Sequence, residues 1–483
     1  MQKIKKKEAI IVVLFCIAIF LLIYSPHFSN PYPLYIDEWQ HITEALKLKN
    51  SEYSGYAKGH EIGFHVFLML ISFVSDIVLI YKFLPALFAV LSSLALFYFI
   101  KKKTGSFWLG LFSMLFFASI KSNINLSGLW FFIPLTFSIP LIYLYFHFFT
   151  QGIENQNKKL ILASLGIMLV LVFVHAISLS FAIPILLIYS FLHKDYIKKE
   201  YKFFSLFLLV PVVLVLFYSL LMKTPIFNAT LLLIKMSKFD YGWNNTAINN
   251  SFLEVYSLIG LALATIGISC LLHNKEARKK YSIFIIWPIV TFLYIIFYKV
   301  IGFSLFSPYQ RNMYYFALSL PFLSAAGLQF ILSKAKAPIR AIRMLKNKEA
   351  FANLVYVLIL IATIFLTFFQ YYTIHENLQI PARIDESDYN AIKFLSTQPK
   401  GNVMAKLPVS MAIYPVSQQN PLATGYFYGD TNIIKTFFNS TDCNTKQQII
   451  SQNNVNYIIS RKSINCGWQI IYNQNNQKIY KIE

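Results

Sequence analysis

Apolar residues follow one another along most of this chain in long runs, and polar residues gather between the runs. A strand with one face in lipid alternates apolar and polar residues, whereas these runs approach the length of a helical bilayer crossing, about 20 residues. The pattern therefore predicts helices that span a membrane. Eleven are expected, at residues 10–24, 81–100, 107–120, 129–149, 160–174, 177–192, 203–222, 252–272, 281–300, 314–332 and 351–371.

One further apolar run, residues 62–78, is interpreted from the distribution of charge. If the N-terminus is cytoplasmic, the eleven helices leave 23 of the 43 Lys and Arg residues in short cytoplasmic segments. This asymmetry is the positive-inside pattern of membrane proteins. A span at 62–78 would move Lys101, Lys102 and Lys103 to the outside. We therefore expect residues 62–78 to form an interfacial or re-entrant helix within a first external loop at residues 25–80.

The pattern changes at about Glu376, where Asn, Gln, Ser and Lys replace Phe and Leu. This change predicts a transmembrane domain at residues 1–375 and a soluble external domain at residues 376–483, which is long enough for a small α/β fold. Its expected elements are a helix at 387–397, strands at 402–407 and 456–460, and a hairpin of 469–472 with 478–482.

Composition agrees with a polytopic α-helical membrane protein of the cell membrane, because 57% of residues are hydrophobic, 17% aromatic and only 13% charged. The membrane orientation explains the distribution of the net charge of +22 better than nucleic-acid binding does, so nucleic acid is not an expected partner. The basic N-terminus precedes an apolar run without a small-residue cleavage site, which predicts an uncleaved anchor. Cys16 and Cys270 lie in predicted spans. Cys443 and Cys466 lie in the external domain, where a disulfide and two free thiols are both open.

The first external loop carries an acidic pair, Asp37 and Glu38. Carboxylates near a bilayer are costly to desolvate, so they usually face a hydrated functional cavity. Such a cavity offers a carboxylate that accepts a proton and cations that hold a departing phosphate, as the transfer of a sugar from a lipid phosphate requires. The other side chains expected at this outer face are His41, Lys58, His60, Glu61, His65, His175, Asp240, Tyr309 and Arg311.

At the acidic segment 37–45, the segment 59–65 and the external Arg311, the chain resembles the GT-C superfamily of membrane glycosyltransferases. This superfamily includes protein O-mannosyltransferases, lipid A aminoarabinose transferases and the catalytic subunit of oligosaccharyltransferase. The resemblance implies a GT-C fold, a polyprenyl-phosphate sugar such as a dolichyl-phosphate sugar as donor, and a protein, lipid or glycan acceptor. It also implies a catalytic or metal-binding role for Asp37 or Glu38, and inversion at the anomeric carbon.

The loop 121–128, where many GT-C members carry a second acidic motif, has no carboxylate in this chain. A hard divalent cation prefers several anionic oxygens. We therefore expect Asp37 to act as a general base without a metal cofactor, with Mn²⁺ or Mg²⁺ as the alternative. Arg311 is expected to hold the leaving phosphate, with help from His175 or His60.

Each candidate also has a structural interpretation. Asp37 and Glu38 are compatible with capping a loop helix, His175 with packing between two helices, and Arg311 with an anchor at the lipid headgroups. Two other functions are open as well. The chain is also compatible with a transporter or flippase of lipid-linked sugars, and with a non-catalytic scaffold that has a binding tail.

Overall fold

A computed structural model describes residues 6–53, 61–123, 127–236, 238–239, 251–305, 307–341, 354–355, 357–368, 384–424 and 429–482. The chain divides into two compact units. The first consists of Met1–Ser25 and Pro85–Gln379, and the second of Pro26–Leu84 and Ile380–Glu483. Each unit is described separately below.

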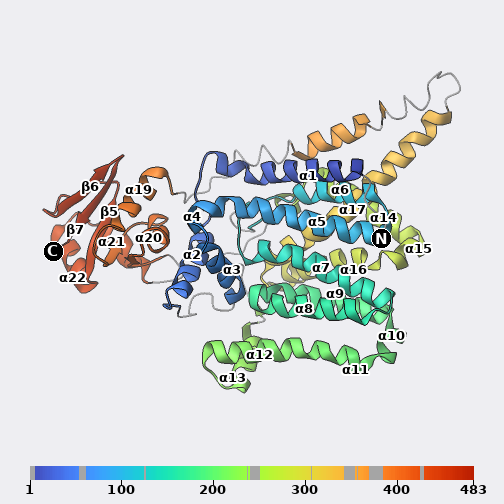
Figure 1. Ribbon diagram of the computed structural model, residues 1–483, viewed down its shortest axis with the longest axis horizontal. Coiled ribbons are helices and arrows are strands. Elements are labelled where there is room, and N and C mark those ends of the chain that lie inside the picture. Colours follow the sequence, from blue (N-terminus) through green and yellow to red (C-terminus); the bar gives the residue numbers. More distant parts are fainter. Residues whose placement is uncertain are drawn as a thin grey trace. The chain divides into compact units, whose positions relative to one another are not determined.

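The first unit is a set of apolar helices, most of which run side by side in Figure 1. Each of the eleven predicted spans overlaps with a helical segment of the structure, with some bounds shifted by several residues. These segments are α1 (Lys6–Tyr24), α5 (Leu84–Thr104), α6 (Phe107–Ala118), α7 (Pro134–Glu154), α8 (Lys158–His175), α9 (Ile177–Leu192), α12 (Leu209–Met222), α14 (Leu258–His273), α16 (Ser282–Ile301), α17 (Tyr309–Ala341) and Val357–Phe368.

Short elements connect these helices. They are α10 (Lys194–Lys199), α11 (Tyr201–Phe204), η4 (Ser205–Leu208), α13 (Ile226–Met236), η6 (Phe252–Glu254), α15 (Lys275–Lys280) and an antiparallel pair, β1 (Lys238–Phe239) with β2 (Ser304–Leu305). Among the described residues, six helices are long and apolar enough to cross a membrane. They are Lys6–Phe28, Ile77–Thr104, Lys158–His175, Tyr201–Leu221, Ser282–Ile301 and Tyr309–Lys334, so the chain is a polytopic helical membrane protein as predicted.

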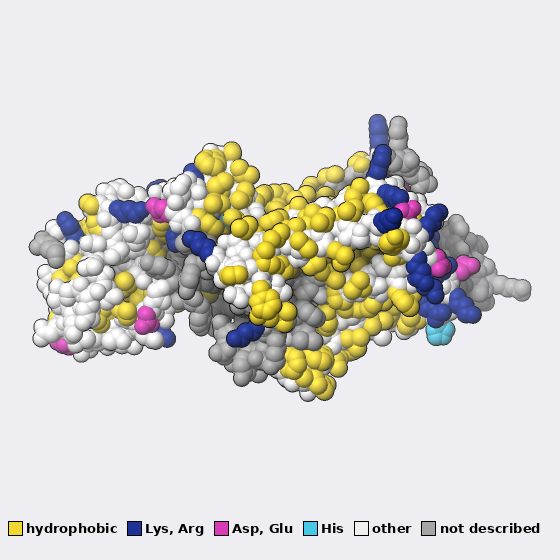
Figure 2. Space-filling model, turned by 90° about the horizontal axis from the view of Figure 1, so that it is seen from below, with side chains coloured by type: hydrophobic (Ala, Val, Ile, Leu, Met, Phe, Trp, Pro, Cys, Tyr) yellow, Lys and Arg dark blue, Asp and Glu magenta, His cyan; other side chains and the backbone are white. Residues whose placement is uncertain are grey.

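The surface of the first unit is apolar along its middle and basic at one end. Figure 2 shows hydrophobic side chains spread over the helices, and Lys and Arg gathered at the end where α10 and α15 lie in Figure 1. Leu208 and Leu220 are 66% and 79% exposed. Exposing such side chains to water is unfavourable, whereas lipid tails accept them.

The described part of the first loop contains short helical elements, which are η1 (Ser25–Phe28), α2 (Ile36–Lys49), α3 (Ile62–Ser72), α4 (Ile77–Ile80) and η3 (Tyr81–Phe83). The apolar run at 62–78 is interrupted between α3 and α4, where Asp76 caps α4 by accepting a hydrogen bond from the Val78 amide at 2.9 Å. The 11 residues of α3 extend over about 16 Å, roughly half the thickness of a bilayer core. This length fits the expected non-spanning helix.

The C-terminal part of the second unit is an α/β fold. Its five-stranded sheet has the order β4-β3-β5-β7-β6, with β3 parallel to β4 and β5, and β7 antiparallel to β5 and β6. The predicted helix, strands and hairpin are all present. The elements are α19 (Glu386–Leu395), β3 (Asn402–Met404), α20 (Val409–Ser417), β4 (Asn420–Pro421), α21 (Thr431–Asn439), α22 (Cys443–Gln452), β5 (Val455–Ser460), β6 (Gln469–Gln474) and β7 (Gln477–Lys481).

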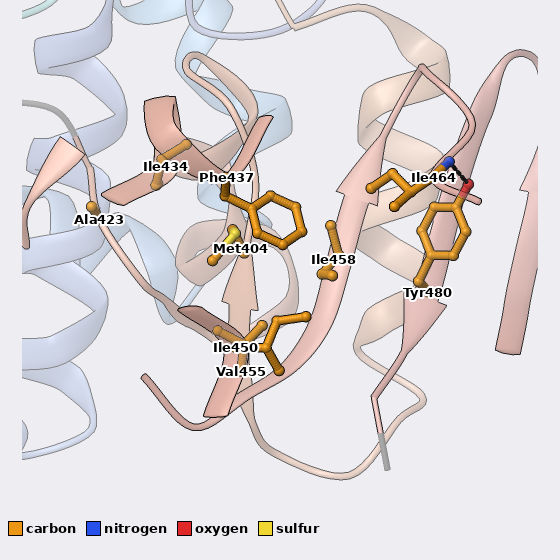
Figure 3. Packing of buried hydrophobic residues seen from close by; sticks show 9 residues of the cluster. All are labelled: Met404, Ala423, Ile434, Phe437, Ile450, Val455, Ile458, Ile464 and Tyr480. Carbon is orange, nitrogen blue, oxygen red and sulfur yellow. Dashed lines mark hydrogen bonds between the residues drawn. The ribbon is translucent and has the colours of Figure 1, made fainter. Parts of the chain in front are cut away.

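The core of this fold lies between the sheet and the helices α21 and α22. Figure 3 shows Phe437 beside Met404, with Ile458 of β5 facing them. The Ile464 amide donates a hydrogen bond of 2.8 Å to the Tyr480 hydroxyl, which ties the loop after β5 to β7. A disulfide joins Cys443 and Cys466, which resolves the alternative that the sequence left open.

The first loop packs against the C-terminal fold within the second unit. Tyr32 stacks on Tyr389 with ring centres 4.5 Å apart. The Tyr414 hydroxyl donates a hydrogen bond of 2.7 Å to Glu52. That bond, together with one from Lys400, lowers the pKa of the Glu52 carboxyl. The two segments therefore form one compact unit although residues 85–379 of the chain lie between them.

Candidate functional site

The acidic pair lies in the first turn of α2, and its two members have different surroundings. The Glu38 carboxylate is fully buried and accepts hydrogen bonds from the amides of Leu34 at 2.7 Å and Tyr35 at 2.9 Å. Glu38 thus satisfies amides that precede the helix and fixes its start. Asp37 is half-buried. Glu38 therefore caps the start of α2, which is the structural role that the sequence allowed for Asp37 and Glu38. Catalysis by either residue stays a prediction.

The loop contains two pairs of a carboxylate and a histidine, and the members of each pair are four residues apart in the sequence. Asp37 and His41 lie on α2, whereas Glu61 precedes α3 and His65 lies in its first turn. Residues at this spacing lie on the same face of a helix, about 5–6 Å apart at Cβ. Since α2 packs against α3, the two faces meet.

The meeting point is a buried cluster of His41, Glu61 and His65. The Nδ1 atom of His41 lies 3.0 Å from Nε2 of His65, and Nε2 of His41 lies 3.8 Å from the Glu61 carboxylate. One ligand atom from each residue lies within 4.8 Å of the other two. Ligand atoms around a tetrahedral zinc ion, each about 2.0–2.1 Å from the metal, are about 3.3 Å apart. The three residues can therefore hold a metal ion.

The second ring nitrogen of His65 is also held. The Tyr53 hydroxyl lies 3.2 Å from Nδ1 of His65. A partner on the far nitrogen fixes the orientation of a metal-binding imidazole. Burial raises the pKa of Tyr53, and the charges of Glu44 and Glu61 raise it further, so the phenol stays protonated at neutral pH.

Two imidazoles and one carboxylate are a set of ligands typical of zinc rather than of Mn²⁺ or Mg²⁺, which prefer oxygen. The expected metal independence stays a prediction, but this cluster argues against it. The sequence interpretation included His41 and Glu61 as substrate-binding candidates and missed Tyr53. The sequence interpretation did not use the repeated spacing of a carboxylate and a histidine in segments 37–41 and 61–65, which is compatible with a paired site but does not specify one.

A second polar group lies in the first unit, at the start of α17. The Arg311 side chain is buried, and its Nη1 donates a hydrogen bond of 2.9 Å to the Ser127 hydroxyl. A buried guanidinium does not extend to lipid headgroups, so the interfacial anchor is not the observed role. Ser127 itself adopts φ +65°, and Gly128 next to it adopts φ +137°. The loop 121–128, which has no carboxylate, thus supplies the hydroxyl that orients the Arg311 side chain.

Gln310 lies beside Arg311 and was not among the predicted residues. Its side chain is fully buried, and neither its Oε1 nor its Nε2 has a hydrogen-bond partner within the described part of the chain. The same holds for the buried Tyr314 hydroxyl, one helical turn away. Unpaired buried polar groups are unfavourable, so those of a native protein often serve a ligand. The start of α17 therefore offers donors to an anion.

The remaining predicted residues have the following places. His175 ends α8 and is buried, with Nδ1 2.7 Å from the Ser178 hydroxyl. Tyr309 is buried and stacks on Tyr298 with ring centres 4.4 Å apart. Lys58, His60 and Asp240 lie outside the described residues. The structure thus brings His41, Glu61 and His65 together in the second unit, and Arg311, Tyr309 and His175 belong to the first unit. A cavity shared by both groups stays a prediction.

No protein-family model matches the sequence, and no curated protein matches it either. Solved structures do match the fold. Oligosaccharyltransferase AglB from Archaeoglobus fulgidus, in complex with an inhibitory peptide and a dolichol-phosphate, matches with TM-score 0.53 and 13% identity over 94% of this chain and 69% of that chain. The oligosaccharyltransferase of the same organism, in complex with Zn and sulfate, matches with TM-score 0.58 and 14% identity over 93% and 67%.

ArnT from Cupriavidus metallidurans, in the apo state, matches with TM-score 0.55 and 11% identity over 97% of both chains. These proteins are membrane glycosyltransferases of the GT-C class. The chain described here therefore has the GT-C fold, and the predicted resemblance is confirmed at the level of the fold. Its match to ArnT covers nearly the whole of both chains, including the C-terminal domain.

Proposed function

We propose that this protein is a membrane glycosyltransferase that moves a sugar from a polyprenyl-phosphate-linked donor to an acceptor at the outer face of the membrane. The observation that supports this most is the position of Asp37 on α2, four residues before His41 of the buried cluster, in the first loop of a GT-C fold. AglB, which has the same fold, binds a dolichol-phosphate and a peptide. We infer a lipid-linked donor and a protein, lipid or glycan acceptor for this chain.

In the proposed mechanism Asp37 accepts the proton of the acceptor as the acceptor attacks the anomeric carbon. The bond between that carbon and the phosphate oxygen breaks on the opposite side, and its electron pair stays on the polyprenyl phosphate. Arg311 and Gln310 bind the departing phosphate, because a guanidinium fork and an amide donor match its oxygens. A single displacement of this kind inverts the anomeric configuration.

His41, Glu61 and His65 would hold a divalent metal ion, with Tyr53 orienting His65. Such an ion supplies positive charge that stabilises developing negative charge at the phosphate or acceptor oxygen. The neighbouring fold supports this assignment, because the A. fulgidus oligosaccharyltransferase was found in complex with Zn. Asp37, one turn from His41, stays the group that takes the proton.

The proposed orientation follows from charge. An orientation with a cytoplasmic N-terminus and an extracellular C-terminal domain satisfies the positive-inside rule. The gathering of Lys and Arg at the end of the first unit that carries α10 and α15 supports it.

The test uses the purified full chain in lipid nanodiscs with a panel of polyprenyl-phosphate-linked sugars and a membrane extract of the source cells as acceptor. Sugar transfer and released polyprenyl phosphate are both measured. Asp37→Asn should lower transfer by about two to four orders of magnitude, the usual contribution of general acid–base catalysis. The matched control is Asp76→Asn, an exposed carboxylate of the same loop whose capping role Asn can keep.

Full transfer by Asp37→Asn would remove the general base from the mechanism. A flippase or scaffold makes a different prediction, because neither would release polyprenyl phosphate in any variant. Retention of configuration in the product would contradict the single displacement.

A further inference from the structure

The C-terminal fold contains a pocket that none of the candidate functional-site residues lines. Its volume is about 620 Å³, within the range of small-molecule sites, about 300–1,000 Å³. The pocket is enclosed by three stretches of chain, at residues 406–409, 438–446 and 459–466. The disulfide between Cys443 and Cys466 joins two of these stretches covalently, which limits how far they can move apart.

Four cationic side chains and one carboxylate line this pocket. The cations are Lys406, Lys446, Arg461 and Lys462, and the carboxylate is Asp388. A cavity lined mainly by one sign of charge concentrates ligands of the opposite sign.

Several of these cations are held in place. Arg461 directs its Nη2 to Asp385 at 2.6 Å and Asp388 at 2.7 Å. Its Nε and Nη1 have no further partner among the described residues, so part of the guanidinium fork stays available. Lys446 is nearly buried, and its ammonium lies 5.5 Å from the centre of the Phe437 ring. Lys406 lies 5.1 Å from the centre of the Phe438 ring in the same way.

The other walls of the pocket suit a carbohydrate. Leu407, Phe438 and Ile464 form an apolar side, and Ser440, Thr441 and Asn465 offer hydroxyl and amide groups. Gln477 also lines the pocket, and its buried Oε1 has no hydrogen-bond partner within the described residues. An orphaned acceptor of this kind is satisfied by a ligand hydroxyl.

Helix α20 starts at Val409 in the pocket wall, and no side chain caps its first turn. The N-terminal end of a helix adds partial positive charge, although the amides of Ser410 and Met411 already donate to the carbonyls of Lys406 and Pro408. Asp442 acts differently at α22, because its carboxylate already binds the amides of Asn444 and Thr445. The partial positive charge at the start of α20 therefore adds to the positive potential that the lysines create in the pocket.

We propose that this pocket binds a phosphorylated sugar. The phosphate would lie among Lys406, Lys462 and the free edge of Arg461, and the sugar would lie against Phe438 with its hydroxyls toward Gln477. A phosphate dianion is favoured over a carboxylate because it carries two charges and three terminal oxygens for these donors. This binding is independent of the glycosyltransferase activity proposed above.

The experiment is isothermal titration calorimetry on the full chain in zwitterionic nanodiscs, with glucose 6-phosphate, glucose and inorganic phosphate as probes. Glucose 6-phosphate should bind saturably and more tightly than either of the other two. Lys406→Glu and Lys462→Glu should each raise its Kd at least about tenfold, the usual effect of losing a charge-assisted contact. The matched control is Lys435→Glu, an exposed lysine of α21 outside the pocket, and its Kd should stay unchanged.

Arg311→Ala separates this pocket from the donor site, and the Kd of glucose 6-phosphate should be the same in that variant. The proposal is overturned if no probe binds saturably, or if Arg311→Ala abolishes binding while the two lysine variants keep it. Equal affinity for inorganic phosphate and glucose 6-phosphate would overturn the assignment of a sugar, because the apolar wall and Gln477 would then contribute nothing.

Discussion

Arg311 is a residue whose observed surroundings differ clearly from the exposed anchor that the sequence also allowed. The residue is 7% exposed, its side chain donates a hydrogen bond to Ser127, and it lies with Gln310 in the first turn of α17. Arg311→Ala should raise the Kd of polyprenyl phosphate about tenfold to a hundredfold. Arg311→Lys should restore only part of it, because a point charge cannot replace a bidentate fork.

Competition between polyprenyl phosphate and the sugar-linked donor, measured in detergent, checks this prediction. Arg278→Ala is the control, because Arg278 lies in the last turn of the basic helix α15. Unchanged donor affinity in Arg311→Ala would mean that the buried guanidinium has a structural role only, which is to hold the loop 121–128 through its hydrogen bond to Ser127.

The cluster of His41, Glu61 and His65 predicts bound metal. We expect the purified chain to retain about one equivalent of zinc per molecule after desalting, measured by mass spectrometry. His65→Ala and Glu61→Gln should each lose most of it, because second-sphere and ligand changes cost tenfold or more in metal affinity. Chelation should abolish transfer, and zinc should restore it.

His273→Ala is the matched control, because His273 is exposed at the end of α14. If the His65 variant keeps the same zinc content as the wild type, the three side chains are a hydrogen-bonded group and the predicted metal independence stands.

At the residue scale, the sequence pointed to candidate residues in the first loop, whose function stays a prediction, but it did not predict how their side chains are arranged. The chemistry of Asp37, His41 and Glu61 is visible in the sequence. The capping role of Glu38 depends on where α2 begins, and the pairing of His41 with His65 depends on which faces of α2 and α3 meet. Neither is encoded in the spacing of residues alone.

Among the helices, the close approach of α14 and α17 gives a sharp prediction. A methyl group at Gly327 would collide with the backbone carbonyl of Leu263, and one at Gly267 with that of Leu323. Small residues at such crossings allow close packing between membrane helices. Gly327→Ala should therefore lower stability by about 1–3 kcal/mol, as overpacking does.

The midpoint of thermal unfolding, followed by size-exclusion chromatography, measures this effect. The control is Gly166→Ala in α8, where a methyl group meets nothing within 4 Å. That substitution should be neutral or slightly stabilising, because Ala forms helix better than Gly. Equal loss in both variants would mean that the crossing tolerates a wider separation.

Elements with a long apolar run or a clear hairpin pattern could be predicted from the sequence, whereas the short helices of the C-terminal fold could not. All eleven apolar runs appear as helices, and the C-terminal hairpin appears as β6 and β7. Helix α20 was missed because its nine residues contain Pro415 and follow Pro408, which are ordinarily signals of a loop. Helices α21 and α22 are nearly as short, and packing on the sheet stabilises them more than local propensity does.

At the scale of the whole molecule, the structure divides into two compact units, and the predicted domain boundary at residue 376 stays a prediction. Residues 26–84 belong with residues 380–483 in one unit. Contacts such as Tyr32 with Tyr389 and Glu52 with Tyr414 join positions that are far apart in the chain. Sequence periodicity reports on neighbours along one element, so it carries no information about such pairs. Whether the two predicted domains fold separately stays a prediction.

The proposed orientation of the molecule yields the last prediction. If the basic segments lie in the cytoplasm, Ser75 in the first loop is outside the cell and Lys279 in α15 is inside. Both positions are exposed, so a cysteine at either can react with a maleimide reagent. In a chain with Cys16 and Cys270 replaced by Ser, an impermeant maleimide should label Ser75→Cys in intact cells and Lys279→Cys only after permeabilisation.

The reagent reports topology independently of activity, because neither residue belongs to the candidate site. The reverse pattern would place the cluster of His41, Glu61 and His65 in the cytoplasm. The charge distribution would then fail to set the orientation, and the acceptor would have to be a cytoplasmic molecule. The expected pattern instead places Asp37 and the C-terminal pocket on the same, external side of the membrane, where a lipid-linked donor and an extracellular acceptor can meet.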